Sequence, residues 1–382
     1  MGATDLSFAR EEECFIVKET TAAGTLEKPG TDDRVYTVGP LDFNQDQEFK
    51  EDEQLRATAS MLSPIKGRKM AGDWSGTLYV KPSGALGTAP EADVLFDCLM
   101  GGGAADAGVD YEYTLENTLS SFSFWSKKGD TVYAGRGATV NTASFTIPGD
   151  DVAKHVFGGQ FMELLWAGTC KTVSIAGAVL TLDPGGTALY KPGMFVEVGS
   201  ADNGGDGFEI ISIHYEAGTM TIEADPGVVG VQTVTPWYPT AGAEVGKPVY
   251  GKMGIITVNG QDFVVLNATL EMNNNIKYYD YEKNDSWTAE KYGRPGRREI
   301  TGTIEAHQLQ RGASYRYRSE YQVQDALLIP AGKTSGYIMR LGIPYAEYTT
   351  PQLSGDEEFI QTITFKAIAS ASYNDEFVIT FL

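Results

Sequence analysis

Three histidines, His155, His214 and His307, are the side chains of this sequence best suited to acid–base or metal chemistry. None lies within metal-ligand spacing of another, so the spacing predicts no zinc site. A catalytic triad would need the fold to bring one of them to a serine or cysteine, and no G-x-S-x-G or Cys/His signature supports that. We therefore expect no enzyme, no catalytic residues, and no metal or organic cofactor.

Residues 202–207 (DNGGDG) have the composition of a calcium-binding loop. They lack the ligand that an EF-hand has at its twelfth position. Asp, Asn and Gly are also the residues that tight turns favour, so we interpret this run as a turn.

Basic side chains concentrate between residues 294 and 318, where they alternate with Tyr315 and Tyr317. Arginines interleaved with aromatic rings can bind nucleic acid. The flanking segments carry no net positive charge, so we favour salt bridges between subunits or rings against acidic surfaces. The arginines concerned are Arg294, Arg297, Arg298, Arg311, Arg316 and Arg318, and all except Arg311 are our inter-subunit candidates.

The 382 residues include 51 acidic and 30 basic side chains, which gives a net charge of −21. No segment is basic enough to hold a phosphate backbone, so ordinary nucleic-acid binding is disfavoured. An acidic surface is functional where a polyanion must pass without binding, although solubility alone also explains such charges.

Three cysteines, Cys14, Cys98 and Cys170, are odd in number and far apart, which argues against a disulfide framework or a zinc knuckle and favours synthesis in a reducing cytoplasm. The apolar stretches are too short to span a bilayer. The first residues show no basic region followed by an apolar core. We therefore expect neither a membrane span nor a secretory signal.

The elements that must position these residues are mostly short strands, because alternating runs separated by Gly, Pro, Asn and Asp recur throughout. One signature appears twice, as GRKMAGDWSGTL at residues 67–78 and GRPGRREITGTI at residues 293–304. A potential short helix follows each copy, at residues 92–100 and 314–324. Chance recurrence of Gly-Thr strands is the alternative, but the agreement in order and spacing predicts a duplicated β-rich unit. Repeats supply equivalent surfaces, so duplication indicates self-assembly more than catalysis.

The pattern divides the chain into four segments. Residues 1–34 form an extended arm with one strand at 14–18, or a disordered terminus. Residues 35–170 are the first unit, 171–250 an inserted small β domain, and 251–382 the second unit. The expected strands of the first unit are residues 41–49, 73–80, 120–126, 139–147 and 157–166, with a flexible loop at 101–110.

The second unit opens with a hairpin at residues 255–265, where Asn259-Gly260 favours a type I′ turn. In the next strand, residues 271–273 stand where residues 42–44 stand in the first unit. In the insert we expect strands at residues 173–175, 179–182, 194–198, 208–213 and 219–224, followed by a linker at 236–242.

With arm, strand, Gly-Thr strand, short helix and closing strands in this order, the chain resembles the major tail tube proteins of long-tailed bacteriophages. The resemblance covers about two thirds of the chain. It rests on the acidic strand 42–48, the strands and helix at 67–80 and 91–100, and residues 133–148, 293–306, 356–367 and 374–381.

This resemblance implies two tandem tail-tube-like β-sandwich or barrel units, each with a short α-helix, whose sheets form a continuous β-barrel around a DNA channel in stacked rings. Family members with one unit form hexamers, and some with two tandem units form trimers with pseudo-sixfold symmetry. This chain looks like the second kind, although hexamers remain the alternative. The resemblance also places the insert outside the tube, and implies tape-measure and tail terminator or tip proteins as partners and the virion tail, assembled in the host bacterial cytoplasm, as the location.

Acidic positions on inner strands would make the lumen negative, so that DNA slides through unbound. The alternative is that these side chains face the outer solvent. The lumen-facing candidates are Asp42, Asp46, Glu48, Glu271, Glu299 and Glu305.

A competing interpretation is a secreted or surface β-sandwich protein that binds glycans or host proteins, with the insert as its binding module. The missing signal sequence and the absence of a disulfide framework weigh against it. A third interpretation, a β-rich hydrolase, has no candidate active site in the sequence.

Overall fold

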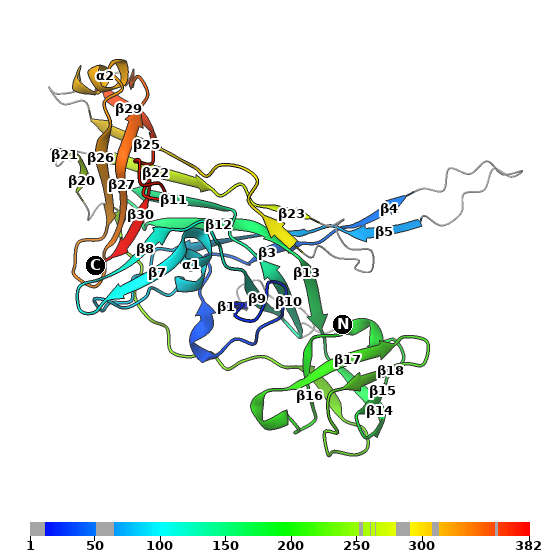
Figure 1. Cartoon of the computed structure of the whole chain (residues 1–382). Helices are drawn as coiled ribbons and strands as arrows, with labels where there is room; N and C mark the ends of the chain where they lie inside the picture. The colour runs from blue at the N-terminus through cyan, green and yellow to red at the C-terminus, as the bar shows by residue number, and fades with distance from the viewer. Residues whose placement is uncertain are drawn as a thin grey trace, which may run out of the picture.

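The computed structural model describes residues 12–50, 65–251, 255–259, 261–263, 265–279, 291–307, 313–355 and 358–382. The protein is mainly β, as predicted, with 50% of its residues in strands and 7% in helices. The strands form one long sheet, a second smaller sheet, a closed barrel and two separate ribbons (Figure 1).

The long sheet contains strands from both predicted units, and all its neighbouring strands are antiparallel. In spatial order its strands are β21 (Gln261–Phe263), β20 (Ile256–Val258), β26 (Asp325–Ala331), β27 (Met339–Tyr348), β29 (Ile360–Ala367), β25 (Glu299–His307), β22 (Val265–Asn273), β11 (Thr142–Pro148), β12 (Lys154–Phe161), β6 (Gly72–Tyr79) and β3 (Asp42–Asn44). The strands added at its sides are β28 (Gln352–Ser354) on β29, β30 (Val378–Phe381) on β27, and the hairpin β7 (Gly101–Asp106) and β8 (Asp110–Leu115) beyond β30.

The two units have the same strand register within this sheet. Residues 42–44 of β3 pair with residues 73–75 of β6. Residues 271–273 of β22 pair with residues 299–301 of β25 in the same way. The predicted equivalence of residues 42–44 and 271–273 is therefore confirmed.

The register also agrees one strand further on. Gly76 of β6 pairs with Phe157 of β12, and Gly302 of β25 pairs with Phe365 of β29. Each unit thus contributes three strands to the sheet in the same order, β3, β6 and β12 from the first unit and β22, β25 and β29 from the second. The glycine of the repeated Gly-Thr signature has the same place in both.

Two ribbons leave the sheet at equivalent points. β4 (Gln47–Lys50) and β5 (Ile65–Lys69) connect β3 to β6, and β23 (Lys277–Tyr279) and β24 (Lys291–Gly293) connect β22 to β25. In Figure 1 the first ribbon extends far from the rest of the fold.

The two predicted helices are present, as α1 (Asp93–Met100) and α2 (Ala313–Glu320). α1 buries Phe96 and Leu99 in the core of the first unit, where the Phe96 ring lies edge-on to Phe157 and Phe381. It ends at Gly101, whose φ of 109° is a left-handed conformation that glycine adopts without strain. The helix therefore stops where the predicted glycine run begins.

The second sheet covers the first unit, in the order β13 (Glu163–Ala167), β10 (Thr131–Ala138), β9 (Phe122–Lys128), β1 (Glu13–Lys18) and β2 (Arg34–Val35). β1, the strand expected within the N-terminal arm, pairs with β9 on one side and β2 on the other. Its Phe15 and Ile16 are buried. The described part of this segment is thus built into the core.

Residues 170–236 form a closed six-stranded barrel of β14 (Cys170–Ala176), β15 (Val179–Leu182), β18 (Thr219–Ile222), β17 (Phe208–His214), β16 (Phe195–Val198) and β19 (Thr233–Pro236). Its interior holds Leu180, Val196, Ile210 and Val234. Closing the strands into a barrel leaves this small sheet without open edges. Three short 3₁₀ turns complete the described elements: Thr31–Asp33, Gly186–Leu189 and Asn203–Gly205.

Four local predictions were wrong. Residues 101–110 are a hairpin, not a flexible loop, because the glycine run is extended by pairing with β8, where a Cβ on Gly103 would lie 2.8 Å from the Tyr113 ring. The expected strand 41–49 is interrupted at Gln45, whose side chain bonds to the backbone of Met162 and Leu164.

The expected strand 157–166 is likewise divided at Met162, where the chain passes from the long sheet to the second sheet. The expected linker at residues 236–242 begins inside β19, a strand that the sequence pattern did not reveal. The predicted turn at Asn259 is confirmed, since this residue has a positive φ of 49° between β20 and β21.

Candidate assembly surfaces

One face of the long sheet is polar along seven neighbouring strands. A row of directly paired residues crosses six of these strands, from Asp42 through Ser75, Gly158, Thr142 and Asn273 to Glu299. Paired residues project from the same face of a sheet, and five steps of about 4.8 Å separate the two carboxylates by about 24 Å. The alternate residues, such as Leu270 and Met272, are buried on the opposite face.

Four of the predicted acidic candidates share this polar face. Asp42, Glu271 and Glu299 are exposed, and Glu305 is half-buried beside Asn267 and Thr362. Asp46 is exposed in the turn after β3, while the Glu48 side chain lies outside the described residues.

Asp73, opposite Asn44, also belongs to this polar face and was not among the candidates. Its alternation with Ser75 and Thr77 in the predicted strand 73–80 was the signal that could have identified it. Lys154 and Lys366 are the lysines on the same face of these strands, and Lys154 has Asp151 as a partner at 3.1 Å. The face therefore carries more carboxylates than ammonium groups.

The predicted arginines are not equivalent. Arg298 is almost fully buried and bonds within the chain to Asn274, at 3.0 Å, and to the Glu116 carbonyl oxygen, at 2.7 Å. Its pKa is lowered, chiefly by burial. Arg294 donates to Asn117 at 3.0 Å.

Arg318 forms an ion pair with Asp325, whereas Arg297 and Arg316 are exposed. Arg311 and the Tyr315 side chain lie outside the described residues. The Tyr317 ring stacks on Tyr321, with ring centroids 4.5 Å apart. Of the predicted arginines that the structure describes, Arg297 and Arg316 are therefore the exposed ones.

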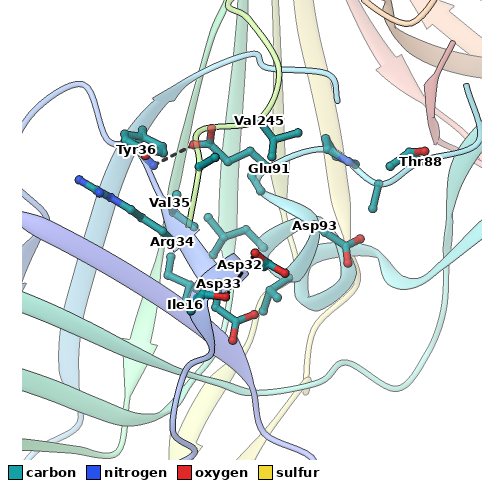
Figure 2. A pocket seen from close by; sticks show the side chains of 17 residues that line it. Ile16, Asp32, Asp33, Arg34, Val35, Tyr36, Thr88, Glu91, Asp93 and Val245 are labelled. Atoms are coloured by element: carbon teal, nitrogen blue, oxygen red, sulfur yellow. Dashed lines mark hydrogen bonds between the residues drawn. The ribbon is translucent and has the colours of Figure 1, made fainter. Parts of the chain in front are cut away.

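A pocket of about 290 Å³ lies between β2, the start of α1 and the segment around Val245 (Figure 2). Its carboxylates already have partners. Glu91 accepts from the Tyr36 backbone N–H at 2.8 Å and pairs with Lys81, and Asp93 accepts from the Tyr113 hydroxyl at 2.5 Å. Burial raises the pKa of both carboxyl groups. This network joins the N-terminal segment to α1, which is a structural role.

Among the residues that the structure describes, no group of side chains is arranged for catalysis or metal binding. No cluster of three or more His, Cys, Asp or Glu side chains there could hold a metal ion. In the run 202–207, the Gly204 N–H donates to the Asp202 side chain at 3.2 Å, and the Gly207 N–H donates to the Asp202 carbonyl oxygen at 2.7 Å. These bonds define a turn. Neither described helix is long and apolar enough to cross a membrane.

The junction between the two units is a strand pair within one chain. β11 of the first unit pairs with β22 of the second over residues 142–148 and 267–273. In the second unit β28 has the place of residues 146–148, since Gln352 pairs with Thr362 as Thr146 pairs with Lys154. Residues 352–354 are exposed and have no strand on their outer side among the described residues.

The opposite end of the sheet has the complementary edge. β3 is equivalent to β22, yet it has β6 on one side and no described strand on the other. The described chain therefore carries one internal junction and, at β28 and β3, two open strand edges equivalent to its two sides.

The family model described as phage tail tube protein matches residues 13–367, nearly the whole chain. A search of curated proteins returns no match.

Proposed function

Because the chain belongs to the phage tail tube protein family, a family of structural virion proteins and not of enzymes, we propose that it self-assembles into stacked rings that form the tail tube. The observation that carries this proposal is the internal β11–β22 junction. Head-to-tail contact between copies would repeat this junction, with β28 of one chain against β3 of the next.

Such a contact satisfies backbone groups that are otherwise open at both ends of the sheet. Exposed strand edges are templates for pairing with another chain. By the equivalence of the units, residues 352–354 of one copy face residues 36–38 of the next, as residues 146–148 face residues 267–269, because Thr37 pairs with Leu78 as Ala268 pairs with Ile304. A heterologous contact of this kind closes into a ring when the rotation per unit allows it.

We propose that three chains form each ring, because two units per chain then supply six equivalent positions. Rings of six chains are the alternative. Continuing the sheet from chain to chain makes a closed barrel.

The polar face of the long sheet would line the channel in this arrangement. The proposed lumen residues on this face are Asp42, Glu271, Glu299 and Glu305, to which we add Asp73. Asp46 and Glu48, which follow β3 in the chain, are proposed lumen residues from the sequence pattern alone. A negative lining repels the phosphate backbone, so DNA passes into the host without specific binding.

The remaining parts have proposed places around this barrel. The ribbons β4–β5 and β23–β24, with the N-terminal segment, would bridge successive rings. The barrel of residues 170–236 would decorate the outside of the tube, and Arg297 and Arg316 would pair with acidic surfaces of neighbouring copies. Tape-measure, tail terminator and tip proteins would be the other partners, with assembly in the host cytoplasm.

Electron microscopy of the purified full chain over a range of concentrations tests this proposal. We expect stacked rings or tubes, with a mass per ring of three chains. Protein that stays monomeric at high concentration would contradict self-assembly, and six chains per ring would contradict the duplicated-unit account.

A further inference from the structure

Two side chains occupy the open edge of β3 at Leu41. The Leu41 backbone N–H donates to Glu12 Oε1 at 3.3 Å, and its carbonyl oxygen accepts from Lys128 Nζ at 2.8 Å. The Glu12 and Lys128 groups lie 3.7 Å apart. In the second unit the equivalent residue, Leu270, is paired with Phe145 of β11. Glu12 and Lys128 therefore stand where the strand of another copy would dock.

The buried site occupied by Glu12 stabilises its carboxylate only in part. Its side chain is only 5% exposed, and Oε2 is buried without a hydrogen-bond partner among the described residues. Leaving such an oxygen buried and unpaired is unfavourable. Glu12 also lies just before β1, outside the paired strand. Its Oε1 accepts from the Ser126 hydroxyl at 2.5 Å, so withdrawal of Glu12 gives up that bond and the contact with Lys128 but breaks no strand pairing.

The incoming strand can form a hydrogen bond with the backbone N–H of Leu41 but not with its carbonyl oxygen. By the same equivalence of units, the residue that takes the place of Phe145 is Pro351, one residue before β28. Its carbonyl oxygen can accept from the Leu41 N–H, which Glu12 now holds. Proline has no N–H, so it cannot donate to the Leu41 carbonyl oxygen, which Lys128 now satisfies.

We propose that Glu12 blocks the docking edge of the free chain and must withdraw for assembly, whereas Lys128 stays and supplies the donor that Pro351 lacks. This inference rests on the proposed function, because it describes the regulation of the same ring contact. Under this proposal Glu12 opposes assembly and Lys128 supports it, although the two side chains form one ion pair.

The test compares Glu12→Ala and Lys128→Met in the full chain. Methionine keeps the length of the lysine stem, whose Nζ lies 4.1 Å from the centre of the Phe43 ring. The readouts are the critical concentration for tube formation, by light scattering and sedimentation, and hydrogen exchange at Leu41. A net hydrogen bond corresponds to about a tenfold change in equilibrium.

We expect Glu12→Ala to lower the critical concentration about tenfold and to speed exchange at Leu41 in the monomer, and Lys128→Met to raise the critical concentration. An unchanged critical concentration with Glu12→Ala overturns the blocking role. A lower one with Lys128→Met overturns the role of Lys128. If the wild-type chain forms no tubes at all, the proposed function itself fails, which is a different result from wild-type tubes that are insensitive to both changes.

Discussion

His155 is buried among aromatic side chains of the first unit, with both ring nitrogens lacking hydrogen-bond partners among the described residues. The Phe96 and Phe157 rings lie 5.3 Å and 4.9 Å from its own, centroid to centroid. Burial lowers its pKa from 6.5 to about 3, because a charged imidazolium would lose its hydration there. The residue is a neutral core side chain and not a catalytic base.

This burial predicts acid sensitivity. The unfolded chain binds a proton at His155 below about pH 6.5, and the folded chain does not until about pH 3. The stabilisation is therefore complete at pH 7 and is lost as the pH falls, by about 3 kcal/mol between pH 7 and pH 4. In His155→Phe, the loss of unfolding free energy between these pH values should shrink by that amount.

Urea unfolding of dilute, unassembled protein at pH 4, 5.5 and 7 measures the effect. His214→Gln is the matched control for the removal of a histidine, because His214 is exposed on β17. Equal pH dependence in wild type and His155→Phe would show that His155 takes up its proton without unfolding.

The two copies of the Gly-Thr strand allow the same substitution to be compared at equivalent positions, Gly302 and Gly76. A Cβ on Gly302 would lie 2.3 Å from the Phe365 ring and 2.4 Å from the Thr269 carbonyl oxygen. At the equivalent Gly76 it would meet only the end of the Leu41 side chain, at 3.0 Å, which can move. We expect Gly302→Ala to lower the free energy of unfolding by about 2 kcal/mol or more, and Gly76→Ala by about 1 kcal/mol or less.

Denaturant unfolding of the two variants measures this difference. Equal losses would mean that the two glycines are under the same constraint and that β25 and β29 pack less closely than the structure indicates.

Much of the element order could be predicted from the sequence. The two helices, the Asn259 turn and the equivalence of residues 42–44 with 271–273 follow from local patterns of apolar residues, glycine and turn residues. The β7–β8 hairpin could not, because Gly-Gly-Gly-Ala-Ala is extended only through its partner strand. The contacts of Glu12 and Lys128 with Leu41 join residues far apart in the chain, and local patterns carry no information about them.

At the scale of the whole molecule, the candidate surfaces were predicted in part. The acidic candidates Asp42, Glu271 and Glu299 were chosen from alternation, and they lie on one face because the two units share one sheet. Arg298 was chosen from charge alone, and charge does not reveal that a side chain is buried against Asn274 and Glu116. A sequence pattern can predict which face of a strand a residue occupies, whereas the residues that its side chain contacts depend on the tertiary fold.

In the proposed ring, β28 of one copy pairs with β3 of the next as β11 pairs with β22 within the chain. Disulfide trapping tests this pairing at one position. Ile147 pairs with Ala268 at the internal junction, and Ala268 pairs with Ile304. Ile304 is equivalent to Leu78, which pairs with Thr37, so the equivalent residues are Leu353 and Thr37. Leu353 is 55% exposed and Thr37 is half-buried, so both positions accept cysteine. The native Cys14 and Cys98 are buried, and burial raises the pKa of both thiols, which keeps them unreactive.

Oxidation of assembled Thr37→Cys/Leu353→Cys protein, followed by non-reducing denaturing electrophoresis, measures this pairing directly. We expect cross-linked species of two and three chains and nothing larger, with no cross-links from either single variant or from the mismatched pair Thr37→Cys/Val229→Cys. An absence of cross-links in assembled tubes would contradict the proposed junction, and a series that extends to six chains would contradict three chains per ring.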